Sequence, residues 1–124
     1  MRASARWIAV GVALTLIGSG AWAQDRAAPP VAASPARGEQ VFGYWCAPCH
    51  SAGPGMPGTQ ALQAKYGGKL PALLLQRSDL TPQIVAYFVR NGISVMPPFR
   101  KTEIGDADLR ALAVYIVATA QAKR

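Results

Sequence analysis

The amino-acid sequence of 124 residues predicts an all-α fold with about three main helices and short helical turns between them. Ser34 and Thr81 each stand directly before a proline, and an N-cap residue followed by proline at the first helical position is typical of a helix start. Apolar residues recur at helical spacing over 84–89 and 109–116. No stretch shows the alternation of a convincing strand. We therefore expect helices joined by irregular loops.

The first 33 residues precede the predicted domain, which spans residues 34–124. Residues 1–23 have the parts of a secretory signal peptide: a basic start, an apolar stretch over 8–17 and a small-x-small cleavage site ending at Ala23. This stretch is much shorter than the run of about 20 residues that spans a bilayer, so we expect cleavage and no stable membrane insertion afterwards; an uncleaved anchor is the less favoured alternative. Residues 24–33 predict a flexible Ala/Pro leader.

The first half of the domain alternates short helices with loops. The first helix starts at Pro35 and continues into residues 46–50. A loop rich in Gly and Pro follows over 53–58. Residues 60–66 then predict a short helix, which two glycines end, and residues 70–76 predict another helical turn.

The second half contains the two helices with the clearest apolar faces. The helix that starts at Pro82 ends at Asn91, before a glycine. It carries its apolar face on Ile84, Val85, Phe88 and Val89. Residues 93–105 form a loop, because its adjacent prolines forbid helix. The last helix starts at Asp106, where acidic residues suit the positive end of the helix dipole. Its inward residues are Leu109, Leu112, Ala113 and Ile116.

The run Cys46-Ala47-Pro48-Cys49-His50 is the C-x-x-C-H pattern by which c-type haem is attached. Two thiols three positions apart can add to the two vinyl groups of one haem, and the adjacent imidazole then becomes the proximal iron ligand. These are the only two cysteines and the only histidine of the chain. We therefore predict one covalent haem c held by Cys46 and Cys49, with His50 on the iron, and an exported chain of this kind suits a bacterial periplasm.

Three other interpretations of this motif are open. A thioredoxin-like dithiol requires a strand-helix-strand context, which the flanking residues do not provide. A structural zinc site requires four ligands, whereas this cluster supplies three. A disulfide between Cys46 and Cys49 is the third alternative.

A helix ending in C-x-x-C-H, a middle helix, a Met-Pro loop and a C-terminal helix resemble a small class I cytochrome c over nearly the whole domain. The resemblance implies the class I cytochrome c fold, wrapped around one covalent haem. In that family the first and last helices cross at a glycine with interlocking aromatic and aliphatic side chains. Gly38 with Phe42, and Leu112 with Tyr115, match this pattern.

The resemblance also implies a second iron ligand, because Met96 stands in the Met-Pro-x-Phe setting that the family shows at this position. A thioether on iron favours the ferrous state and raises the reduction potential. The alternatives are a core-filling methionine at position 96 or ligation by Met56, whose Gly/Pro setting is unfavourable.

Further contacts of the haem and its ligands are implied in the same way. The family orients the proximal imidazole through a proline carbonyl in the following loop, and Pro57 is favoured here over Pro54. Trp45 is expected to pack in the core, with contact to the macrocycle as the alternative. Candidates to contact a haem propionate are Arg77, Tyr66 and Lys69.

If His50 and Met96 fill both axial positions, the remaining chemistry is one-electron transfer at the haem edge, and the protein is not an enzyme. The domain has no nucleophile-base pair, since its single imidazole is assigned to iron. The alternative is a peroxidase or gas-binding haem protein with an open distal site, which requires Met96 to be off the iron.

The net charge of the chain and the sequence around Met96 both give information on the binding partner. Of 13 Lys and Arg residues two lie in the signal peptide, which leaves 11 against six acidic residues and a formal charge of +5. Such a surface can steer an acidic protein partner, and no basic run with interleaved aromatics indicates nucleic acid. Residues 88–99 resemble the cytochrome subunit of p-cresol methylhydroxylase-type flavocytochromes.

That resemblance implies docking on an FAD-containing dehydrogenase that oxidises 4-alkylphenols, with electrons passed on to the respiratory chain. The alternative is a freely diffusing shuttle to a terminal oxidase. Arg100 and Lys101 follow the proposed ligand loop and would meet carboxylates of the partner, unless they are an ordinary solvated pair.

Overall fold

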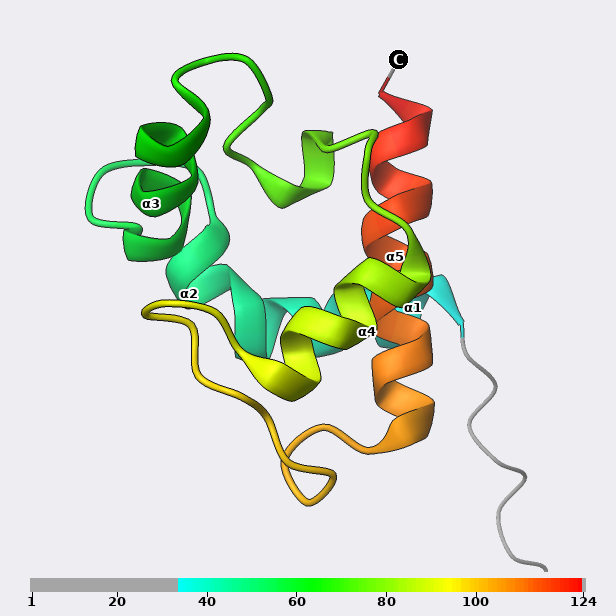
Figure 1. Cartoon of the computed structure of the whole chain (residues 1–124). Coiled ribbons are helices and arrows are strands. Elements are labelled where there is room, and N and C mark those ends of the chain that lie inside the picture. Colours follow the sequence, from blue (N-terminus) through cyan, green and yellow to red (C-terminus); the bar gives the residue numbers. More distant parts are fainter. Residues whose placement is uncertain (1–33, 124) are drawn as a thin grey trace, which may run out of the picture.

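The computed structural model describes residues 34–123, which form helices joined by loops (Figure 1). In chain order the elements are α1 (Pro35–Val41), a π-helical turn (Phe42–Cys46), α2 (Ala47–His50), α3 (Pro57–Tyr66), a 3-10 turn (Leu74–Gln76), α4 (Pro82–Asn91) and α5 (Asp106–Ala122). Within this described part the β-type pairing is limited to an isolated bridge between Ile93 and Met96. The all-α prediction is therefore confirmed.

The predicted signal peptide and leader, residues 1–23 and 24–33, lie outside the described residues. From residue 34 to residue 123, no helix combines the length and the apolar character needed to cross a membrane. The division of the chain at residues 23 and 33 therefore stays a prediction.

The N-terminal helical segment begins where its cap predicts. The Ser34 hydroxyl accepts a hydrogen bond from the Arg37 backbone N–H at 3.2 Å, and Pro35 takes the first helical position. α1, the π-helical turn and α2 then follow one another without a gap into residues 46–50, as predicted. The π-helical turn differs from the continuous helix that the sequence predicts, because no residue pattern indicates such a turn.

α1 and α5 cross in close contact at Gly38. A Cβ atom at position 38 would overlap the Ala111 carbonyl oxygen and lie 2.5 Å from the Cβ of Tyr115, so only glycine allows this approach. Beside the crossing, the ring centroids of Phe42 and Tyr115 are 5.8 Å apart, and Leu112 is fully buried. The interlocking pattern expected for these residues is confirmed.

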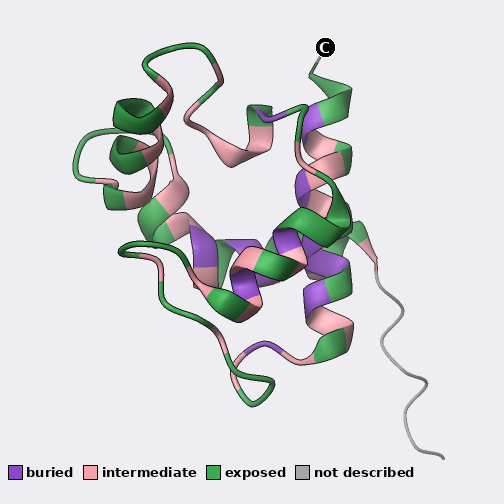
Figure 2. Cartoon of the chain, in the orientation of Figure 1, coloured by how far each residue is buried: buried purple, intermediate pink, exposed green. Residues whose placement is uncertain are grey.

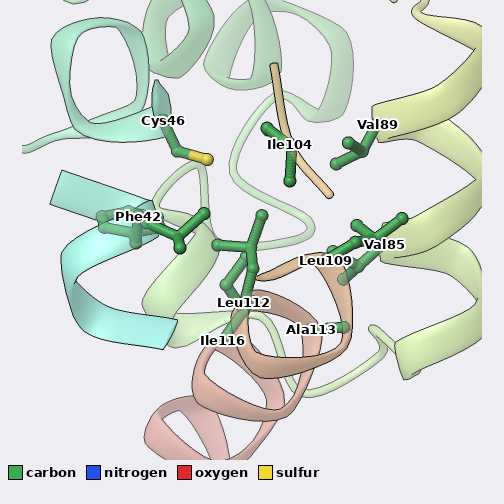
Figure 3. Close-up of a cluster of buried hydrophobic side chains, with 10 residues drawn as sticks. Phe42, Cys46, Val85, Val89, Ile104, Leu109, Leu112, Ala113 and Ile116 are labelled. Atoms are coloured by element: carbon green, nitrogen blue, oxygen red, sulfur yellow. The ribbon is translucent and has the colours of Figure 1, made fainter. Parts of the chain in front are cut away.

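The core lies between the first helical segment, α4 and α5, where the buried residues gather in Figure 2. It consists of Val41, Phe42, Cys46, Val85, Val89, Ile104, Leu109, Leu112, Ala113 and Ile116 (Figure 3). All four residues of α5 predicted to face inward are buried. Ile84 differs from the prediction, because it lies at the exposed edge of the α4 face. Ile104, from the loop before α5, is a core residue that helical spacing does not reveal.

α3 differs most from its prediction. It begins at Pro57, three residues before the predicted start at Gln60, because proline is favourable at the first position of a helix. Residues 57 and 58 are therefore helical and not part of the preceding loop. The helix ends at Gly67, which adopts a left-handed φ of 55°. None of its ten residues is buried.

Candidate functional site

The two cysteines of the motif lie in different environments. Cys46 ends the π-helical turn and is buried, and its sulfur is directed toward the core cluster (Figure 3). Cys49 lies one turn later and is exposed, and the two sulfurs are not bonded to each other. Burial, with a smaller effect of the Cys49 charge, raises the pKa of Cys46 to about 12. The motif therefore presents one thiol from the interior and one from the surface.

His50 ends α2, and its imidazole is enclosed on one side by the start of α3. A Cβ atom at Gly58 would lie 2.6 Å from the His50 Cε1 atom and 2.8 Å from Nδ1, so the glycine backbone itself packs on the ring. The Thr59 hydroxyl donates a hydrogen bond to the Ser51 carbonyl at 2.9 Å, which ties α3 to the residue after the motif. Burial lowers the pKa of His50 and favours the neutral imidazole, the form that binds a metal ion.

The expected hydrogen bond from His50 to a proline carbonyl is not formed. Among residues 34–123, Nδ1 of His50 is the one buried side-chain nitrogen or oxygen atom without a hydrogen-bond partner. Pro57, the favoured acceptor, begins α3, so its carbonyl points along the helix axis. Pro54 lies in the loop before α3 and does not accept from Nδ1 either.

Met96 lies in a tight two-residue hairpin. Its backbone N–H donates to the Ile93 carbonyl at 2.9 Å, and its carbonyl accepts from the Ile93 N–H at 3.0 Å. Ser94 has a φ of 54°, so the positive φ falls at the first central residue of the turn, as in a type II′ hairpin. Met96 is partly buried and packs against the core cluster that contains Cys46, whereas Val95 is 74% exposed. The hairpin therefore directs the thioether, and not its neighbour, toward the interior.

Two aromatic side chains connect the motif to the Met96 loop. Trp45 packs against the core, and its ring meets Phe99 edge to face with centroids 5.6 Å apart. The core-packing role expected of Trp45 is therefore confirmed. Phe99 is also partly buried against the core. Residues just before Cys46 and just after Met96 thus share one packing contact.

Of the three propionate candidates, the structure brings two together. The Arg77 side chain is only 5% exposed and donates from Nε and Nη2 to the two Asp79 carboxylate oxygens, each at 2.6 Å. Its guanidinium carbon lies 4.5 Å from the Tyr66 ring centroid. The hydrogen bond that Arg77 donates to Asp79 is the largest cause that raises the pKa of Arg77. Lys69 stays exposed.

A hollow of about 500 Å³ lies beside α3. Its walls come from α3 and from the segment that follows it, and they include Thr59, Gln63, Leu70 and Leu73. None of the four predicted site residues lines this hollow.

The donor set fits haem c. The motif offers two separate thiols, a neutral imidazole whose Nδ1 faces the start of α3, and a half-buried thioether that packs on the same cluster as Cys46. Imidazole and thioether are the axial ligands of low-spin cytochromes. Within residues 34–123, no three His, Cys, Asp or Glu side chains converge to hold a metal ion by themselves. These residues would therefore bind the iron as part of a haem.

Known proteins match this chain over most of the described domain. Residues 33–116 match the family described as cytochrome c oxidase, cbb3-type, subunit III. A cytochrome c6 of Picosynechococcus sp. is 38% identical over 95 residues, which cover 75% of this chain and 80% of that protein. A cytochrome c6 of Cyanidioschyzon merolae is 32% identical over 90 residues, which cover 73% of this chain and 79% of that protein.

The family match over residues 33–116 includes the C-x-x-C-H motif and Met96, and the matches agree with the all-α fold and with the donor set. Members of this family carry covalently bound haem c and transfer electrons, and they are not enzymes. The chain therefore belongs to the cytochrome c family, as a small class I c-type cytochrome that carries haem c.

Proposed function

We propose that this protein is an exported, periplasmic one-electron carrier in which Cys46 and Cys49 hold the haem and His50 and Met96 ligate its iron. The observation that carries the proposal is the hairpin that turns the Met96 thioether toward the cluster containing Cys46. Bound haem supplies a one-electron couple at its exposed edge. The neutral His50 imidazole and the Met96 sulfur would both ligate the iron and would so keep oxygen and peroxide from binding to it.

The optical spectrum of the haem-matured protein tests the ligand set. We expect a low-spin spectrum in both redox states and the weak near-infrared sulfur-to-iron band in the ferric state. Met96→Ala should lose this band and bind carbon monoxide, while Met56→Ala, the matched control at the other methionine of the domain, should keep it. A wild-type protein that is high-spin and binds carbon monoxide would overturn the proposed ligation by Met96.

For the partner, we propose an FAD-containing dehydrogenase of the 4-alkylphenol-oxidising type, on which this chain acts as the cytochrome subunit before electrons pass to the respiratory chain. The sequence of residues 88–99 supports this choice. The surface beside Met96 is suited to docking, because Ile93 and Val95 are exposed on the hairpin and Arg100 and Lys101 lie just beyond it. An apolar centre with a charged rim is the usual anatomy of a protein interface.

Arg100 and Lys101 are not free charges within the domain. Arg100 lies 3.6 Å from a Glu103 oxygen, and Lys101 lies 2.8 Å from an Asp106 oxygen. Both basic side chains are more than two-thirds exposed, so these pairs are solvent-screened and weak. Partner carboxylates can therefore compete for the two cations at small cost.

Charge reversal tests the docking surface. Arg100→Glu with Lys101→Glu should slow reduction by a purified FAD-containing 4-alkylphenol dehydrogenase and flatten the dependence of the rate on ionic strength. The control is Arg110→Glu with Lys123→Glu, which makes the same change of charge on α5. Both double variants must keep the near-infrared band. Equal rates in the two variants would remove Arg100 and Lys101 from the interface.

A diffusing shuttle to a terminal oxidase is the second candidate for the electron route. It is favoured by the matched family, whose description names a cbb3-type oxidase subunit, and by the similarity to cytochromes c6. Oxidation of the reduced protein by membranes that contain a terminal oxidase, compared with its reduction by the dehydrogenase, distinguishes the two routes. Fast oxidation without measurable reduction by the flavoprotein would select the shuttle.

A further inference from the structure

The segment that follows Met96 is held by the end of α4. The Phe99 backbone N–H donates to the Val89 carbonyl at 2.8 Å, and the Phe99 carbonyl accepts from Arg90 Nη1 at 3.0 Å. Both backbone groups of Phe99 are therefore bonded to consecutive residues in the last turn of α4. The two residues between Met96 and Phe99 are prolines, which have no N–H to donate. Phe99 is thus the nearest point after Met96 where the backbone N–H is anchored.

Arg90 also reaches the first residue of α5. Its Nη2 atom donates to Asp106 Oδ1 at 3.0 Å, and the other oxygen of Asp106 accepts from Lys101 at 2.8 Å. The Arg90 side chain is 23% exposed, whereas that of Arg100 is 83% exposed. A single guanidinium therefore connects the end of α4, the loop at Phe99 and the start of α5.

The backbone before Met96 is held as closely as the segment that follows it. A Cβ atom at Gly92 would lie 2.5 Å from the Met96 carbonyl oxygen and 2.9 Å from the Pro98 nitrogen, so the hairpin lies directly on the end of α4. The positive φ of Gly92, 67°, allows the chain to turn there. Phe99 is further fixed by its ring contact with Trp45. Met96 is consequently bounded on one side by Gly92 and on the other by the Arg90–Phe99 hydrogen bond.

We propose that Arg90 is a positioning residue for Met96: by holding the Phe99 carbonyl and the Asp106 carboxylate together, it keeps the thioether at the iron. This inference rests on the proposed ligation by Met96. Without Arg90, the span from Met96 to Phe99 keeps the two hydrogen bonds between Met96 and Ile93, the hydrogen bond to Val89 and its packing contacts, but it loses the connection to α5, so the sulfur should leave the iron more often. External ligands then bind faster, because they enter when the sulfur is off.

Ligand binding to the ferric holoprotein measures this opening. With cyanide as the probe, Arg90→Ala should raise the rate of binding about tenfold, as expected for the loss of charge-assisted hydrogen bonds. Arg90→Lys should give a smaller increase, because an ammonium keeps the charge but not the planar fork that serves two acceptors. Asp106→Asn should also give a smaller increase, since the bond to Phe99 remains.

A matched control separates positioning from a general loss of stability. Arg37 also makes a two-pronged pair, in which Nε and Nη2 each donate to an Asp108 carboxylate oxygen at 2.7 Å, but these bonds join α1 to α5 and do not involve Phe99. Arg37→Ala should lower the midpoint of denaturant unfolding and leave the cyanide rate unchanged. The positioning role would be wrong if Arg90→Ala and Arg37→Ala bound cyanide at the same rate. It would also be wrong if Arg90→Lys and Arg90→Ala both bound cyanide at the wild-type rate.

The near-infrared band of the wild type distinguishes a failure of this inference from a failure of the proposed function. If the wild type shows the band and the Arg90 variants bind cyanide at its rate, the positioning role alone is wrong. If the wild type lacks the band, Met96 is not a ligand and both proposals fall. The Arg90→Lys variant provides the measurement if Arg90→Ala does not fold.

Discussion

α5 and α3 are both regular helices, yet only α5 takes part in the core. Six residues of α5 are buried, whereas α3 has none, and Figure 2 shows the same contrast between the two helices. α5 packs on α1 through the glycine crossing and on α4 through the core cluster. α3 is held instead by its contacts with the motif, through Gly58 on the His50 ring and Thr59 on the Ser51 carbonyl.

The difference separates two ways of stabilising a small domain. The part built from α1, α4 and α5 is stabilised by burial of apolar side chains within the protein. The part between residues 51 and 80 relies on the motif, on the Arg77–Asp79 pair and on half-buried leucines. We therefore expect core substitutions to change stability far more in the first part than in the second.

The largest effect is expected from truncating the core on α5. Leu112→Ala removes a fully buried side chain and should lower the free energy of unfolding by about 3 kcal/mol. The matched change in α3, Leu62→Ala, should cost less than about 1 kcal/mol, because Leu62 is only half-buried. Denaturant unfolding of the two ferric holoproteins measures both values. Equal losses of unfolding free energy in the two variants would show that α3 contributes a buried face once haem is bound. The contrast between α5 and α3 would then be wrong.

A smaller effect is expected from filling the helix crossing. Gly38→Ala places a methyl group against the Ala111 carbonyl and the Tyr115 Cβ, and overpacking of this kind should cost about 1–3 kcal/mol. Gly43→Ala is the control, because a Cβ atom there meets nothing within 4 Å and alanine is the better helix former. Thermal unfolding should show a lower Tm for the first variant and an unchanged or higher Tm for the second. A neutral Gly38→Ala would mean that the crossing tolerates separation of α1 and α5.

The smallest effect should come from the two ion pairs, one in each part. The hydrogen bond from Arg77 holds the pKa of Asp79 below its usual value of 3.8, and that from Arg37 does the same for Asp108. Because both pKa values are lowered by folding, each stabilisation is present above about pH 3.8 and is lost as the pH falls through the lowered value.

Asparagine variants distinguish these pairs. Asp79→Asn leaves the buried Arg77 without its counter-charge and should cost roughly 1 kcal/mol at pH 7, a modest figure because the Asp79 carboxylate is itself partly solvated. Asp108→Asn leaves an Arg37 side chain that is 40% exposed, compared with 5% for Arg77, so its effect should be smaller. Unfolding curves between pH 2 and pH 7 should show a reduced acid dependence in each variant. A larger loss for Asp108→Asn would reverse the expected order.

Elements with local signals are the ones that the sequence predicts well. Ser34 and Thr81 cap α1 and α4 as expected, and each accepts a backbone hydrogen bond from the residue three positions later. The inward face of α5 follows from helical spacing alone. The helix crossing at Gly38 could be predicted only from the family resemblance, since a single glycine in a helix does not indicate which residues pack against it.

Most differences from prediction involve contacts that residue patterns do not reveal. The exception is local: the glycines around Pro57 predict a loop, yet this proline begins α3. The burial of Arg77 and the double contact of Arg90 are not visible in the sequence, because a charged residue is expected at the surface unless its partner is known. Ile104 is buried from within a loop, where no periodicity applies.

The chemistry of this protein follows from residue types and covalent spacing, which are local properties. Two thiols and an imidazole lie in one motif, and a methionine stands before two prolines. Only the tertiary structure decided how these groups are held. The burial of Cys46, the glycine backbone against His50 and the Arg90 contacts with Phe99 and Asp106 depend on close packing between different segments of the chain. That packing arises only when the helices meet.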